Sequence, residues 1–185
     1  RERTARPARP AARTRRTSPL RWAWLAALLG AAAQAGPPPG DPAALVRAVH
    51  AVAPAAERLA ARTKPAEWPL LRACLYYALA GQRLLAARGI PTVLNRGRLV
   101  YAPGTPACHP IHPHVWLESP EHLIDFSTLP RWGRPTVIPL SRAASPDSAP
   151  SGPPLALRLP QPCDAACREG FIRHRERFLS RAAQA

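Results

Sequence analysis

The stretch that decides the fold is His114-Val-Trp-Leu-Glu-Ser-Pro-Glu-His-Leu-Ile-Asp-Phe126. Two short segments with several apolar residues, 115–118 and 123–126, flank the turn-forming sequence at 119–122. This pattern is typical of two antiparallel strands joined by a tight turn. In such a hairpin His114 and Asp125 lie near the far ends of facing strands. Their side chains meet if the register gives both the same face.

Two helices are predicted before this hairpin. Residues 42–62 carry apolar side chains at three- and four-residue spacing, and Asp41-Pro42 is a favourable helix start. Residues 70–88 continue the helical pattern, and Gly89-Ile-Pro91 ends it. The apolar faces of both helices indicate that they pack against a common partner.

Further short strands are expected around the hairpin. Residues 91–97 and 98–102 favour one strand or two, and residues 136–140 favour an edge strand that tolerates a proline. The order of helix, helix, strands and hairpin predicts an α+β domain. Its helices are expected to pack on one face of a small antiparallel sheet.

Proline divides the chain into segments. The sequence has 25 prolines among 185 residues, and most of the excess lies outside the middle. A Pro-rich or Arg/Ala/Pro-rich segment without apolar periodicity cannot build a core. We therefore expect a disordered basic leader or signal-like segment at 1–40, a folded domain at 41–140, a Pro/Ser-rich linker at 141–162 and an amphipathic helix at 163–185.

The formal net charge of +15 does not form one basic stripe. Residues 1–21 hold eight arginines, and the other basic residues are scattered as single charges. Nucleic-acid binders usually show a basic stripe interleaved with aromatic residues. We therefore expect no nucleic-acid partner.

Residues 22–35 form a short apolar run after the basic stretch, ending in Ala33-Gln34-Ala35. This layout resembles a secretory signal, but the run is too short for a stable membrane span. We expect a cytoplasmic protein in which this leader is spurious or removed. Export through the signal-like segment 1–35 is the alternative.

Three residues form a candidate catalytic triad: Cys74 near the start of the second helix, His114 and Asp125. A thiol attacks carbonyl carbons as thiolate, which a protonated imidazole and helix N-terminal amides favour. The histidine then serves as general base and acid, and a carboxylate orients its ring. If His114 and Asp125 both point to the helix side of the sheet, they can also meet Cys74.

Cys74, the helix end Arg88-Gly-Ile-Pro91, His114-Val-Trp-Leu-Glu118 and Leu123-Ile-Asp-Phe126 together resemble the transglutaminase-like superfamily. The resemblance covers about residues 45–140. It is strongest to a small uncharacterised bacterial branch, through Val49-His-Ala-Val52, and the chain is also similar to lasso-peptide leader peptidases. The resemblance implies a papain-like fold and a triad of Cys74, His114 and Asp125.

The expected activity is that of a cysteine-dependent hydrolase or acyltransferase acting on a peptide or a small amide or ester, without a cofactor. Weaker candidates for substrate binding or for an oxyanion contact are Trp68, Tyr77 and Trp116. Each of these aromatic residues could instead simply pack in the hydrophobic core.

Two other functions stay open. An inactive domain of the same fold could bind a peptide in the same cleft. Alternatively, Cys108, His109, His112 and His114 place four zinc-compatible side chains within seven residues, although their spacing matches no standard zinc motif. For Cys163 and Cys167, four residues apart, we expect apolar packing rather than a metal clip or a disulfide.

Overall fold

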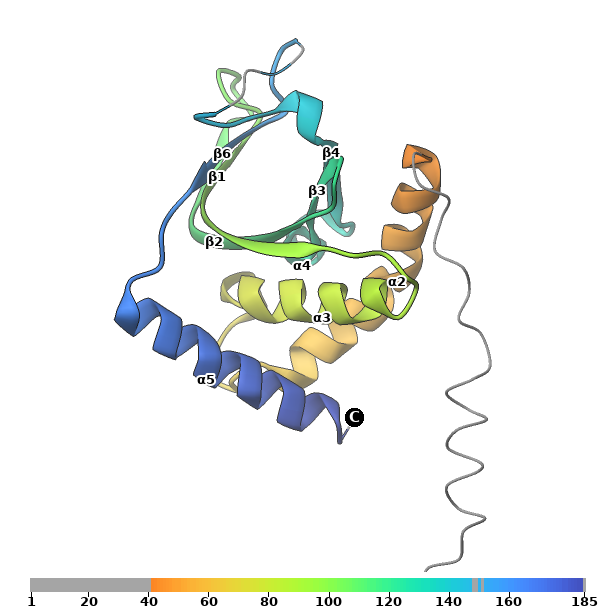
Figure 1. The fold of residues 1–185 in the computed structure, drawn as a ribbon, viewed down its shortest axis with the longest axis vertical. Helices are drawn as coiled ribbons and strands as arrows, with labels where there is room; N and C mark the ends of the chain where they lie inside the picture. Colours follow the sequence, from red (N-terminus) through yellow and green to blue (C-terminus); the bar gives the residue numbers. More distant parts are fainter. Residues whose placement is uncertain (1–40, 148–149, 151, 185) are drawn as a thin grey trace, which may run out of the picture. The chain divides into compact units, whose positions relative to one another are not determined.

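The computed structural model describes residues 41–147, 150 and 152–184, and the predictions for 1–40 lie outside this part. Helices and a six-stranded sheet make up the fold (Figure 1). The predicted α+β class is confirmed, although the sheet is larger than the small one expected.

Helix α2 (Pro42–Thr63) forms where the apolar spacing predicts it. The Asp41 carboxylate caps it by accepting a hydrogen bond of 3.0 Å from the Ala44 N–H. The second predicted helix is shorter than expected. The single turn η1 (Leu70–Arg72) comes first, Ala73 departs from helical backbone angles, and α3 (Cys74–Ala86) follows.

The sheet has the strand order β4-β3-β2-β1-β6-β5. Neighbouring strands run antiparallel, except that β5 is parallel to β6. The edge position predicted for residues 136–140 is confirmed by β4. The strands are β1 (Val93–Tyr101), β2 (His109–Glu118), β3 (His122–Asp125), β4 (Thr136–Pro139), β5 (Ala143–Ala144) and β6 (Ala156–Pro160).

The predicted hairpin is present, with two corrections to its ends. Strand β2 begins at His109, because its first residues pair with the second half of β1. Strand β3 ends at Asp125, since that carboxylate accepts from the Ser127 N–H at 2.8 Å and caps the turn η2 (Phe126–Thr128). The short helix α4 (Leu129–Trp132) follows.

The prediction of an irregular linker at residues 141–162 is wrong. This segment contains the end of the turn η3 (Leu140–Arg142) and the strands β5 and β6. Strand β6 pairs with β1 over its whole length, and Ala156 is fully buried. The residues of β6 have little strand propensity of their own, and their pairing with the distant strand β1 stabilises them in extended conformation.

The C-terminal helix is confirmed as α5 (Ala165–Ala182), but the expectation for its cysteines is wrong. Cys163 and Cys167 form a disulfide with a Cα–Cα distance of 5.3 Å. The bond spans the start of α5, where Asp164 accepts from the Cys167 N–H at 2.8 Å. Farther along, Phe178 is buried with residues of α2 and α3, so α5 belongs to the folded core.

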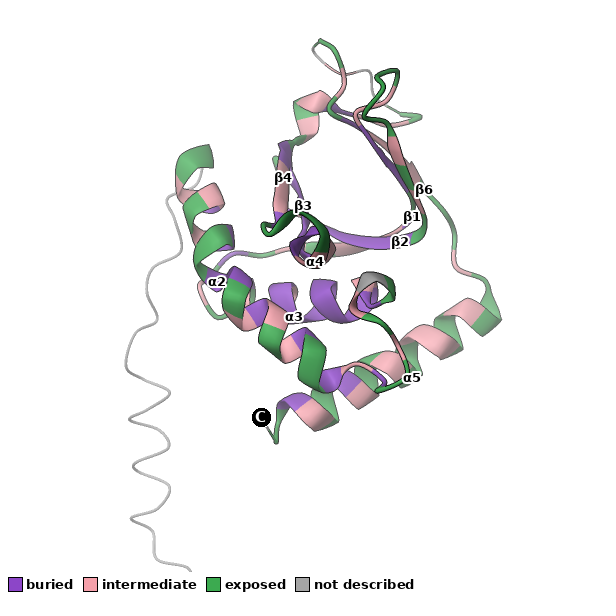
Figure 2. Ribbon diagram, turned by 180° about the vertical axis from the view of Figure 1, so that it is seen from behind, coloured by how far each residue is buried: buried purple, intermediate pink, exposed green. Residues whose placement is uncertain are grey.

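Two apolar clusters occupy the two faces of the sheet. Val115 and Leu117 of β2 pack with the helices, whereas Trp116 between them packs with Leu99 and Tyr101 on the other face. Figure 1 shows α3 lying between the curved sheet and α5, with α2 alongside. Figure 2 shows most of α3 as buried, which agrees with its central position.

In the part of the chain that the structure describes, no helix has the length and apolar character needed to cross a membrane.

A glycine sets how closely α3 approaches the turn after β3. A Cβ atom at Gly81 would lie 2.2 Å from Cδ2 of Phe126, a distance that real Cβ atoms do not reach. Phe126 is itself buried, so its ring has little room to move. Direct contact between the Gly81 backbone and the Phe126 ring therefore fixes the spacing between α3 and the residues next to Asp125.

Replacing Gly81 by Ala is expected to lower the free energy of unfolding by about 1–3 kcal/mol, because the added methyl group overpacks this contact. Urea unfolding followed by circular dichroism measures the change. Gly170→Ala in α5 is the matched control, since a Cβ there meets nothing within 4 Å. The control should gain up to about 1 kcal/mol from helix propensity. Equal effects of both variants would contradict the close-packing argument.

Candidate active site

Cys74 is the first residue of α3, and its side chain is half-buried. The turn η1 and Ala73 take up the residues after Pro69, so the cysteine is in the first turn of the helix instead of the second. Backbone N–H groups in the first turn of a helix have no intrahelical acceptor and favour negative charge nearby. The structure therefore places the thiol at the helix N-terminus, beside the first backbone N–H groups of α3.

His114 and Asp125 meet as the hairpin predicts. Nε2 of His114 lies 2.7 Å from Oδ2 of Asp125, and both side chains are about 1% exposed. They share the sheet face with Trp116, whose ring stacks against the His114 ring at a centroid distance of 6.2 Å. Their neighbours Val115 and Ile124 pack on the helix side of the sheet.

Asp125 accepts four hydrogen bonds. Its Oδ2 accepts from His114 and from the Tyr101 hydroxyl at 2.5 Å. Its Oδ1 accepts from the N–H and the hydroxyl of Ser127, both at 2.8 Å. A buried carboxylate with this many donors keeps its charge and has no rotational freedom left. Sequence reasoning missed Tyr101 and Ser127, although Ser127 follows Asp125 by only two residues.

The hydrogen-bonded pair shifts the pKa of both partners toward the charged forms. Burial opposes the charge on His114, but the Asp125 carboxylate and the Cys74 sulfur raise the pKa of His114 to about 10. Burial likewise opposes ionisation of Asp125, but His114, Tyr101 and Ser127 hold the pKa of this carboxyl below its ordinary value. The geometry thus favours an imidazolium beside a carboxylate.

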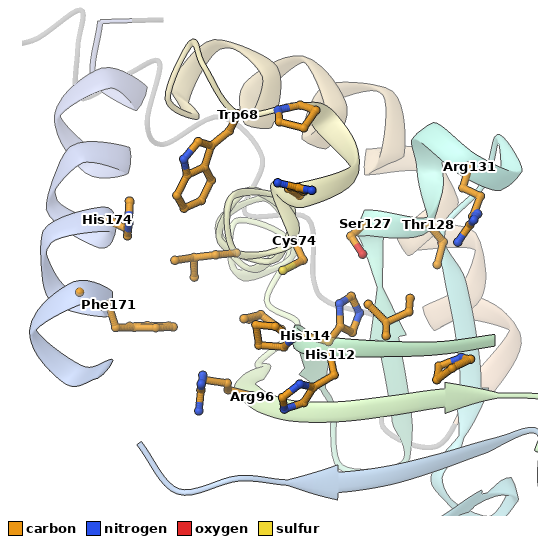
Figure 3. Close-up of a pocket in the computed structure, with 18 of the residues that line it drawn as sticks. Trp68, Cys74, Arg96, His112, His114, Ser127, Thr128, Arg131, Phe171 and His174 are labelled. Carbon is orange, nitrogen blue, oxygen red and sulfur yellow. The ribbon is translucent and has the colours of Figure 1, made fainter. Parts of the chain in front are cut away.

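His114 also faces Cys74. Its Nδ1 has no hydrogen-bond partner among the described residues, and the Cys74 sulfur is near enough to affect the ring's pKa. Both side chains line one pocket, shown in Figure 3. His114 therefore lies between the thiol and the carboxylate, with one ring nitrogen available for each.

The pocket has a volume of about 960 Å³. Its walls come from η1 and the start of α3, from β1 and β2, from the segment 127–132 and from α5. Its lining includes Glu67, Trp68, Arg72, Cys74, Arg96, His114 and Arg131.

The weaker aromatic candidates separate into one pocket residue and two core residues. Trp68 lines the pocket, where its ring lies 4.8 Å from that of His174 on α5. Tyr77 is fully buried near Glu57, and burial raises the pKa of its hydroxyl to about 12. Trp116 is also fully buried and donates to Glu118 at 2.8 Å. Neither Tyr77 nor Trp116 lines the pocket, because both side chains point into the core.

The proposed zinc ligands do not converge. His112 bonds to Gln161 at 2.9 Å, and His109 accepts a hydrogen bond from Arg131. His114 bonds to Asp125. Cys108 is exposed ahead of β2. Among the residues described, no three His, Cys, Asp or Glu side chains gather in a metal-binding arrangement. The zinc alternative has no geometric support.

In comparisons with known proteins, no family model, no curated protein and no solved structure matches this chain.

Replacing Asp125 by Asn is expected to lower the pKa of His114 from about 10 toward the ordinary 6.5. An amide removes the negative charge that stabilises the imidazolium. The measurement is an NMR titration of the His114 ring, with the exposed Asp147→Asn as the control. An unchanged titration of His114 in Asp125→Asn would show that the pair does not set its charge.

The same shifts give the pH dependence of stability. His114 binds protons more tightly when folded, so its contribution is full below pH 6.5 and is lost as pH rises through about 10. Asp125 binds protons less tightly when folded, so its contribution is present above pH 3.8 and is lost as pH falls. Asp125→Asn should remove both dependences.

Proposed function

We propose that the chain is a cysteine-dependent hydrolase or acyltransferase acting on amides or esters. Cys74 is the nucleophile, His114 the general base and acid, and Asp125 the residue that orients His114. One observation carries this proposal. The His114 ring bonds to a fully hydrogen-bonded Asp125 through Nε2, its Nδ1 has no partner among the described residues, and the ring lines the same pocket as Cys74.

In the first half of the reaction, the Cys74 thiolate adds to the carbonyl carbon of the substrate. The carbonyl π electrons move to oxygen, and the resulting oxyanion lies near the backbone N–H groups that begin α3. When the carbonyl re-forms, the C–N or C–O bond breaks. The leaving group takes the proton from the His114 imidazolium, and a thioester remains on Cys74.

In the second half, neutral His114 accepts a proton from the incoming nucleophile as it attacks the thioester. Water gives hydrolysis and an amine gives acyl transfer. Collapse of the second tetrahedral intermediate breaks the C–S bond and returns the thiolate and imidazolium. Asp125 keeps the ring oriented for both steps, because its remaining acceptor positions are occupied by Tyr101 and Ser127.

We further propose that the fold is papain-like and related to the transglutaminase-like superfamily. Support comes from the order of elements: Cys74 begins a buried helix, His114 lies on a later strand, and Asp125 ends the antiparallel neighbour of that strand. The segments that carry the sequence resemblance are thus the segments that form the site.

The disulfide between Cys163 and Cys167 indicates the kind of cellular compartment in which such an enzyme would work. Disulfides persist in oxidising compartments and are rare in the cytosol. The Cys163–Cys167 bond therefore favours the exported alternative over the cytoplasmic expectation.

The first test is iodoacetamide labelling at about pH 6, where an ordinary thiol is only about 0.3% thiolate. Cys108 is exposed and Cys74 is half-buried, so access alone favours Cys108. If Cys74 and His114 form a thiolate–imidazolium pair, Cys74 is expected to react about tenfold faster or more, as mass spectrometry of the two peptides measures.

His114→Ala should remove this advantage and leave the labelling of Cys108 unchanged. A Cys74 that reacts no faster than Cys108 in the unaltered protein would refute the enzyme and leave the inactive peptide-binding domain as the interpretation of this cleft.

The second test is acylation by p-nitrophenyl acetate. We expect a burst of nitrophenolate and a Cys74 peptide that is heavier by an acetyl group, because the thioester forms before it hydrolyses. Asp125→Asn should slow the burst by roughly 10²–10⁴-fold, since His114 loses its orientation. Cys108→Ala is the matched control and should keep the full burst. A burst that survives Cys74→Ala would assign the chemistry to another residue.

A further inference from the structure

Positive charge surrounds the pocket that holds Cys74. Three arginines line it, Arg72, Arg96 and Arg131, and Glu67 is the one acidic residue among its described lining. A concave site lined by charges of one sign concentrates ligands of the opposite sign. The positive lining therefore indicates that the pocket binds a negatively charged substrate.

None of these three arginines has an acidic partner among the described residues. The ion pairs of the described residues are Arg47–Asp41, His114–Asp125 and Arg158–Glu118, and none of them involves a pocket arginine. Arg131 donates to His109, and burial followed by the charge of Arg131 lowers the pKa of that histidine. A neutral His109 leaves the charge of Arg131 uncompensated.

Arg96 is the most informative of the three. Its side chain is only half-exposed, and within the described chain its guanidinium has neither an ion pair nor a hydrogen bond. None of its nitrogens is among the buried polar atoms that lack a partner, so its N–H donors reach solvent and are free to bind a ligand in the pocket. A planar guanidinium matches a carboxylate with two parallel hydrogen bonds, so a carboxylate is the partner that this position fits.

The arginines also lie close to the reacting groups. Arg96 pairs with Val115 in the β1–β2 ladder, directly beside the pairing of Gly97 with His114. Arg72 ends η1, two residues before Cys74. In Figure 3, Arg96 and Arg131 lie on opposite sides of Cys74. A chain bound across the pocket would meet positive charge on both sides of the carbonyl that Cys74 attacks.

We propose that the substrate is an acidic peptide, with an Asp or Glu side chain near the scissile or transferred acyl group held by Arg96. Arg72 and Arg131 attract further acidic residues of the same chain. The apolar surface of Trp68 and Phe171 in the same pocket accommodates neighbouring apolar side chains. A peptide is favoured over nucleic acid because Cys74 needs an acyl carbon, which a phosphodiester backbone does not offer.

This inference rests on the proposed function, because it assigns the substrate of the same pocket, but its test needs no turnover. The full chain carrying Cys74→Ala is titrated into two fluorescein-labelled hexapeptide pools. The pools are identical except that one has Glu wherever the other has Gln. Fluorescence anisotropy at about 0.15 M ionic strength gives the dissociation constants. We expect about tenfold tighter binding of the Glu pool, the range of a charge-assisted hydrogen bond.

The decisive comparison is between Arg96→Gln and Arg83→Gln, each added to Cys74→Ala. Arg83 is exposed on α3 and does not line the pocket, so the two variants lose the same charge. Arg96→Gln should reduce the preference for Glu to about twofold or less, whereas Arg83→Gln should keep it. Arg72→Gln, also exposed, provides a second pocket variant if Arg96→Gln unfolds, and it should reduce the preference in the same direction.

Three results would overturn the proposal: equal affinity for the two pools, equal losses in Arg96→Gln and Arg83→Gln, or full displacement of the Glu pool by a stoichiometric oligonucleotide. The matched control is needed because residues 1–21 carry eight further arginines. Failure of the enzyme appears separately as an unreactive Cys74 in the labelling experiment. If the chain prefers the Glu pool but Cys74 is unreactive, the acidic-peptide site stands and the proposed catalysis is refuted.

Discussion

A buried carboxylate with no access to water must find all of its hydrogen-bond donors within the protein. Asp125 finds them on three different segments: Tyr101 on β1, His114 on β2 and Ser127 in the turn after β3. Each donor can reach it only if those segments keep one mutual register. The hydrogen bonds to Asp125 thus fix the positions of β1, β2 and the end of β3 relative to one another. They also orient His114, the histidine that lines the pocket with Cys74.

The helix that carries Cys74 is connected to this cluster through packing. Phe126 follows Asp125 in the chain, and its ring lies against the bare backbone of Gly81 on α3. The aromatic ring and the carboxylate are attached to adjacent Cα atoms, so the position of α3 and the position of the His114–Asp125 pair are set together. Because this contact is close and buried, α3 has little freedom to shift relative to the sheet.

Local sequence was enough to predict α2, the hairpin, the edge strand and the meeting of His114 with Asp125, since short spacing and turn chemistry decide these features. Predictions failed where distant segments meet. Strand β6 is a short stretch among prolines that forms because β1 pairs with it. Tyr101 reaches Asp125 from 24 residues away, which no local pattern indicates. The side of the sheet that His114 takes depends on register and packing, so the sequence left this orientation open.

Because α5 supplies one wall of the pocket, the pocket is assembled in a fixed order during synthesis. A ribosome synthesises Cys74, His114 and Asp125 well before the residues of β6 and α5. The nascent chain therefore carries these three side chains for a time without Phe171 and His174, which complete the pocket. The pocket is therefore completed last, once α5 has been synthesised and has packed on the core through Phe178.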